Sequence, residues 1–184
     1  MKRVFVIGFW IALMVLALLM GSGAASAERL PEQVPSNIRG LSAEEIRSLR
    51  DGEGMGLARA AELNGYPGPT HLLEAAREGK IHLDAGQQEA IERIRATMKA
   101  EAQALGRQIL ALEAALEAGF GERRLTEAEL ARQIEEIGSR RAALRLAHLR
   151  AHFLTAGLLR LEQIEHYAQI RGYASASPGH GHGH

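Results

Sequence analysis

Two histidines four residues apart are the side chains of this 184-residue chain whose types and spacing point most directly to chemistry. His148 and His152 lie in the apolar stretch 144–153, and a helix over this stretch places both imidazoles on one face. Imidazoles at this spacing are a common half-site for Zn²⁺, Ni²⁺, Co²⁺ or Cu²⁺. The alternative is that His148 packs in the core with one nitrogen hydrogen-bonded, while His152 lies at the rim of that core.

A metal site built on this pair needs one or two more ligands from other parts of the chain. Glu62, His71 and His82 carry suitable oxygen or nitrogen donors and are the candidates. Spacing along the sequence leaves open which of the three comes close to the pair.

The last residues carry a second group of imidazoles. Residues 175–184 end in Gly-His-Gly-His-Gly-His, so His180, His182 and His184 alternate with glycine. Flexible glycines allow such imidazoles to surround a zinc, nickel, cobalt or copper ion with little strain, which makes residues 174–184 a candidate metal-binding tail that is itself disordered. The alternative is a terminus that binds metal only in vitro. Under both interpretations of the tail, we expect that the protein requires no cofactor and that a bound Zn, Ni, Co or Cu ion is optional.

The sequence predicts a binding protein rather than an enzyme. The chain has no cysteine, which excludes thiol catalysis and thiolate metal sites. It also lacks a glycine-rich phosphate loop after a strand and the His-Glu-x-x-His and Gly-x-Ser-x-Gly motifs. No set of residues in the sequence is therefore a candidate for catalysis.

The first 27 residues have the pattern of an export signal. Lys2 and Arg3 precede the apolar run 4–20, and Ala25, Ser26 and Ala27 form a cleavage signature. We expect cleavage after Ala27 and a periplasmic mature protein. The alternative is an uncleaved helix that anchors the chain in the inner membrane.

Composition and charge favour a helical protein without nucleic-acid partners. Residues 28–184 lack two of the 22 basic residues and keep all 22 acidic ones, so their net charge is near −2. This balance gives no electrostatic footprint for nucleic acid. Aromatic residues make up only 4%, while alanine, leucine, glutamate and arginine are abundant, as in long helices.

Capping boxes mark where three helices begin. Each has a Ser, Asp or Thr followed three residues later by Glu or Gln, and the three pairs are Ser42–Glu45, Asp84–Gln87 and Thr126–Glu129. They predict a short helix ending near residue 52, a long helix from 85 to about 118, and a second long helix from 127. Shorter helices are expected over residues 55–63, 70–77 and 159–171.

Both long helices carry an apolar stripe at steps of three and four residues. The first stripe is Ile91, Ile94, Met98, Ala102, Leu105, Ile109, Leu112 and Leu116, and the second is Leu130, Ile134, Ile137, Leu144, His148 and Ala151. A connection of about seven residues predicts that the helices fold back as an antiparallel hairpin. The fold class is therefore all-α. We expect a homodimer to cover the stripes; the alternative is that the short helices cover them within one monomer.

The predicted organisation has four parts. Residues 1–27 are the signal peptide, 28–79 hold short helices and turns, 80–173 form the hairpin domain, and 174–184 are the histidine-rich tail. Within the hairpin domain one motif occurs twice: Leu83-Asp-Ala-Gly-Gln87 opens the first long helix and Leu159-Arg-Leu-Glu-Gln163 opens the last helix.

These two segments fit the frame Leu-Thr-x-x-Gln, with Asp84 and Arg160 in the place of threonine. In a cysteine-free, exported helical chain, this pattern resembles the Spy/CpxP family of periplasmic chaperones and stress-response accessory proteins, a superfamily that includes heavy-metal sensors. Asp84 keeps the capping chemistry and Arg160, which cannot accept a hydrogen bond, departs from it.

The resemblance covers about residues 80–173 and implies a curved, cradle-like or intertwined antiparallel dimer. Its concave face would bind unfolded periplasmic proteins without ATP, or contact a sensor kinase. The alternative function is a periplasmic heavy-metal sensor or buffer that uses the tail and the His148/His152 pair.

Overall fold

The computed structural model describes residues 38–173, which lie within one compact unit of the chain. In this range the chain forms six helices and no strand: α2 (Ala43–Asp51), α3 (Arg59–Glu62), α4 (Pro69–Arg77), α5 (Ala85–Gly121), α6 (Glu127–Ala156) and α7 (Leu161–Ile170). The all-α prediction is confirmed.

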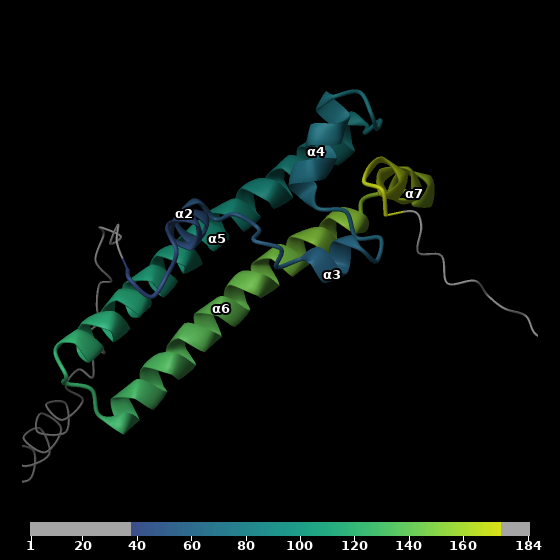
Figure 1. Cartoon of the computed structure of the whole chain (residues 1–184). Coiled ribbons are helices and arrows are strands. Elements are labelled where there is room, and N and C mark those ends of the chain that lie inside the picture. Colours follow the sequence, from purple (N-terminus) through teal and green to yellow (C-terminus); the bar gives the residue numbers. More distant parts are fainter. Residues whose placement is uncertain (1–37, 174–184) are drawn as a thin grey trace, which may run out of the picture. The chain divides into compact units, whose positions relative to one another are not determined.

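The two long helices form the predicted antiparallel hairpin (Figure 1). The first, α5, was expected to stop near residue 118, but it continues through Gly119 to Gly121. Gly119 is buried, and an ideal Cβ there would lie 2.7 Å from Leu125 Cγ, so the glycine provides room for the turn that follows. The left-handed residue of this turn is Arg123, with a φ of 54°.

All three capping boxes form as predicted. The Asp84 carboxylate accepts from the Gln87 amide at 2.9 Å, and the Gln87 side chain accepts from the Asp84 amide at 3.1 Å. The same exchange occurs between Ser42 and Glu45 and between Thr126 and Glu129. These boxes satisfy amides that have no partner inside the helix and thereby fix where α2, α5 and α6 begin.

The remaining helices differ from expectation at their ends. Helix α3 covers only Arg59–Glu62 instead of residues 55–63, because Met55 and Gly56 have positive φ values of 44° and 72°. Helix α4 begins with Pro69, one residue earlier than expected, and has no side-chain cap. Helix α7 begins at Leu161, two residues later than expected.

The segment from α2 to α4 crosses the hairpin. It contacts α5 through α2, reaches α6 through α3, and returns through α4, which contacts both long helices (Figure 1). Helix α2 approaches α5 closely at Gly106, where an ideal Cβ would lie 1.8 Å from the Leu49 carbonyl oxygen. Only glycine permits this backbone contact.

Two clusters of buried side chains form the core. The first joins α2 to the middle of the hairpin and contains Ile38, Ile46, Leu49, Ala102, Ile109, Leu110 and Leu144. The second joins α4, α5 and α7 and contains Leu72, Leu73, Ala75, Ile81, Leu83, Ile91 and Tyr167. The short helices thus cover part of each predicted stripe.

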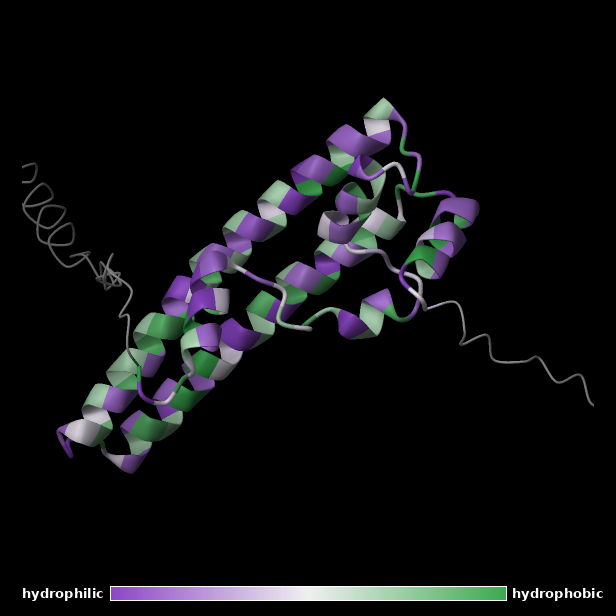
Figure 2. Ribbon diagram, turned by 45° about the horizontal axis from the view of Figure 1, so that its top comes forward, coloured by the Kyte–Doolittle hydropathy of each residue, from purple (hydrophilic) through white to green (hydrophobic). Residues whose placement is uncertain are grey.

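The cover is incomplete. On the α5 stripe Ile94, Leu105, Leu112 and Leu116 are only half-buried, and on the α6 stripe Ile134 is exposed. Figure 2 shows apolar residues recurring along both long helices. Homodimer formation remains a prediction. None of the helices formed by residues 38–173 has the length and apolar character needed to span a bilayer.

Candidate functional site

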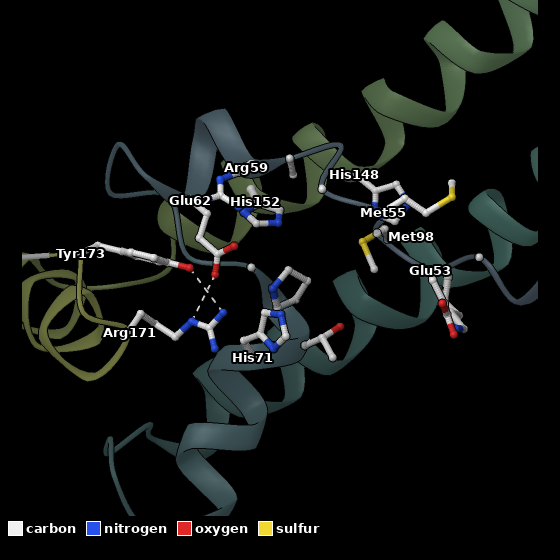
Figure 3. Close-up of a pocket in the computed structure, with 18 residues that line it drawn as sticks. Glu53, Met55, Arg59, Glu62, His71, Met98, His148, His152, Arg171 and Tyr173 are labelled. Atoms are coloured by element: carbon white, nitrogen blue, oxygen red, sulfur yellow. Dashed lines mark hydrogen bonds and ion pairs between the residues drawn. The ribbon is translucent and has the colours of Figure 1, made fainter. Parts of the chain in front are cut away.

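A cavity of about 580 Å³ lies beneath the segment that crosses the hairpin. We call it the histidine–methionine pocket and define it by the side chains of Met55, Glu62, His71, Met98, His148 and His152 (Figure 3). Helix α6 contributes both members of the predicted histidine pair, α5 contributes Met98, and the loop after α2 contributes Met55.

His148 is buried, with 3% of its surface exposed, and its Nε2 has no hydrogen-bond partner. Burial lowers the pKa of His148 below its usual value, and the nearby His152 and Lys99 lower it further. The ring is therefore neutral near pH 7. A neutral imidazole in a pocket wall whose buried nitrogen has no hydrogen-bond partner is unusual for a core residue.

His152 has a different environment. Its Nδ1 lies 2.8 Å from the Tyr66 carbonyl oxygen, and a carbonyl only accepts, so Nδ1 carries the hydrogen. The lone pair of the neutral ring is then on Nε2, the arrangement common in metal-binding histidines. The ring packs on Gly68, where an ideal Cβ would lie 2.7 Å from Cε1. The alternative in the sequence analysis was that His148 is hydrogen-bonded in the core and His152 lies at its rim. In the structure both rings are buried, and the hydrogen-bonded ring is that of His152.

Of the three candidate further ligands, two reach the pocket. Glu62 lines it, but its carboxylate accepts from the Tyr167 hydroxyl at 3.1 Å and pairs with Arg171 at 3.4 Å. His71 lines it with its Nδ1 3.0 Å from Glu74. His82 is not among the residues of the pocket. Across residues 38–173, no three His, Asp or Glu side chains come close enough to hold one ion together.

Sequence reasoning did not connect the two methionines with the histidine pair. Met98 is 9% exposed and Met55 is 42% exposed, and both line the pocket together with His148 (Figure 3). The sequence did place Met98 on the α5 stripe and His148 on the α6 stripe, and this was its one indication that the two residues face the same core. The register of the two helices decides that both residues line one pocket, and spacing within one helix does not reveal it.

A second feature is an apolar surface on α6 and its neighbours. One groove, of about 500 Å³, lies between α3 and α6, and its apolar side chains are Ala60, Ala61, Tyr66, Leu146, Leu149 and Phe153. We call it the α3–α6 groove. The Tyr66 and Phe153 rings stack there with centroids 6.1 Å apart, yet Phe153 is 65% exposed.

A neighbouring groove of about 390 Å³ runs between the two long helices. Its apolar side chains are Ile94, Met98, Ala147, Ala151, Leu154 and Leu158, and we call it the hairpin groove. Arg150 borders both grooves and lies 3.7 Å from Glu101. The two grooves are therefore neighbours on α6, with Arg150 between them.

The other predicted site residues, His180, His182 and His184, lie outside the described residues, as does the predicted signal peptide 1–27. Comparisons with models of protein families, with curated proteins and with solved structures find no match for this chain.

Proposed function

We propose that this protein is a periplasmic, ATP-independent chaperone or envelope-stress accessory protein that binds unfolded polypeptides on its helical surface. The observation that supports this most is the apolar region formed by the α3–α6 groove and the hairpin groove. The exposed side chains at its rim are Leu146, Phe153, Leu154 and Leu158. Contiguous exposed apolar surface marks sites that bind other molecules.

The chemistry of this region suits clients of varied sequence. Apolar contact is non-directional, so it does not require one particular side chain from the client. Met98 in the hairpin groove is a flexible side chain that adapts to different shapes. Arg93 and Arg150 border the groove and would contact acidic client residues or their backbone carbonyls.

The client is an unfolded polypeptide. A homodimer that left the grooves open would be consistent with the cradle that the family resemblance implies. The periplasmic part of a sensor kinase is a further possible partner under the stress-response alternative.

Client protection tests the proposal. Reduced α-lactalbumin, which aggregates without any need for ATP, is mixed with an equimolar amount of the protein, and light scattering is followed. We expect the wild type to suppress scattering and the double variant Leu146→Ser, Phe153→Ser to lose most of that effect. Phe120→Ser is the matched control, because Phe120 is exposed at the far end of α5. Equal loss in the control, or no suppression by the wild type, would contradict the proposal.

The second candidate function is a heavy-metal sensor or buffer. It is favoured by the two buried imidazoles of His148 and His152, which line one pocket, and by the histidines of the tail. Calorimetry with Zn²⁺, Ni²⁺, Co²⁺ and Cu²⁺ separates the two sites. The variant His180→Ser, His182→Ser, His184→Ser removes the tail site, and His148→Ala removes the pair. Absence of metal binding in the wild type would exclude this function.

A further inference from the structure

We propose that the histidine–methionine pocket binds a soft monovalent cation, Cu⁺, through His148 Nε2 and the thioether sulfurs of Met98 and Met55. The proposal deepens the metal-binding candidate and rests on it, because it names the ion and the ligands. It does not require the binding of unfolded polypeptides, although Met98 also lines the hairpin groove.

The first argument is the state of His148. Its ring is buried and its Nε2 lies in the pocket wall without a hydrogen-bond partner. A buried polar atom without a partner is unfavourable, and native proteins keep few of them.

The second argument is that two methionine side chains, those of Met98 and Met55, line the same pocket as this nitrogen's ring (Figure 3). Thioether donors favour Cu⁺, and imidazole also binds copper. The chain has no cysteine, so methionine provides its soft sulfur ligands.

The backbone of Met55 supplies a third, independent observation. Met55 has a φ of 44°, in the left-handed region, and lies between Gly54 and Gly56. Residues other than glycine are uncommon there, and such strain gathers at functional sites. Met55 is 42% exposed and lines the pocket, and a role as a sulfur ligand would account for the left-handed backbone there.

The pocket disfavours a divalent ion. Among the described residues no three His, Asp or Glu side chains converge on one point, as a zinc site requires. The Glu62 carboxylate already accepts a hydrogen bond from the Tyr167 hydroxyl and forms an ion pair with Arg171. Lys99 lines the same pocket, and its positive charge repels an ion of charge two more strongly than an ion of charge one.

The test is a titration of the purified protein with Cu⁺ under anaerobic conditions, in competition with bicinchoninate. The parent is the variant His180→Ser, His182→Ser, His184→Ser, which removes the tail imidazoles. Met98→Leu and Met55→Leu, each tested singly, remove one thioether at nearly constant volume, so both variants should fold. His82→Gln is the matched control, because His82 is an exposed histidine outside the pocket.

We expect the parent to bind one Cu⁺ at the pocket, with X-ray absorption showing sulfur among the ligands. Met98→Leu should weaken Cu⁺ binding about tenfold or more at an unchanged unfolding midpoint, and His82→Gln should not. The proposal would be overturned if the parent, which lacks the tail imidazoles, bound no Cu⁺. It would also be overturned if the Met98→Leu variant bound Cu⁺ as tightly as the parent does. If Zn²⁺ still bound to the wild type in that case, the metal-binding function would stand without this site.

Discussion

The side-chain amides of Gln87 and Gln163 are hydrogen-bonded to each other in both directions. Gln87 Nε2 donates to Gln163 Oε1 at 2.9 Å, and Gln163 Nε2 donates to Gln87 Oε1 at 3.0 Å. Each side-chain amide makes two further hydrogen bonds. Gln87 donates to the Leu158 carbonyl and accepts from the Asp84 backbone amide. Gln163 donates to the His82 carbonyl and accepts from the Arg160 backbone amide. All donors and acceptors of both amides are satisfied.

The repeated Leu-x-x-x-Gln frame therefore joins the beginnings of α5 and α7. Arg160 cannot accept a hydrogen bond, so only the Gln163 half of that capping exchange exists, and the missing half does not prevent α7 from starting there.

Gln163→Met should destabilise the protein by about 2 kcal/mol or more. The substitution keeps the volume but leaves the His82 carbonyl and the Arg160 amide without their side-chain partner in a partly buried place. Urea unfolding followed by circular dichroism measures the change. Gln88→Met is the control, because Gln88 is exposed and bonds only to Glu92. Similar losses for both variants would contradict a role for the amide pair.

Two glycine substitutions should have opposite signs. Gly106→Ala places a Cβ against the Leu49 carbonyl and should destabilise the protein by about 1–3 kcal/mol, because α2 must move away from α5. Gly138→Ala meets nothing within 4 Å in the exposed middle of α6 and should stabilise by about 0.5–1 kcal/mol. Both are measured by urea unfolding; stabilisation by Gly106→Ala would disprove the close contact.

Stability should fall as the pH decreases below about 6.5 because of His148. Its pKa is lowered in the folded protein by burial, His152 and Lys99, so the unfolded chain takes up the proton first. The loss therefore begins at the usual histidine value of 6.5 and continues down to the lowered folded pKa. We expect lower unfolding free energy at pH 5.5 than at pH 7.5, and a smaller difference in His148→Gln.

This pH window is separate from that of the carboxylates. The Ser42 backbone amide holds the pKa of Glu45 below 4.5, and the Thr126 amide does the same for Glu129, so their contributions are lost only as the pH falls below 4.5. A His148→Gln variant with the same change between pH 7.5 and 5.5 as the wild type would show that other groups cause it.

Glu62 should stabilise the junction of α3 and α7. Its carboxylate accepts from the buried Tyr167 hydroxyl and pairs with Arg171. Glu62→Gln keeps an acceptor for Tyr167 but loses the charge, and we expect a loss of about 1 kcal/mol; Glu62→Leu should lose about 2–3 kcal/mol because the hydroxyl is also left without a partner. Denaturant midpoints give both values. Glu74→Gln, at an exposed pair with His71, should change stability by less than about 0.5 kcal/mol.

Features that depend on neighbours in the chain were predictable from sequence. A capping box is a set of bonds within four residues, so Ser42, Asp84 and Thr126 predicted the starts of α2, α5 and α6. The ends were less predictable: α5 continues past Gly119, which packs closely against Leu125, and ends at Gly121.

By itself, the sequence determined that the chain is helical, where its long helices begin, and that His148 and His152 share a face. Only the tertiary structure decided that Met98 lines the same pocket as this pair, and that Gln87 meets Gln163. It also decided that the His152 ring is hydrogen-bonded to the Tyr66 carbonyl, while His148 Nε2 has no partner. The reason is physical: local hydrogen bonds specify a helix, but the register between helices depends on packing over the whole contact, which no single stripe encodes.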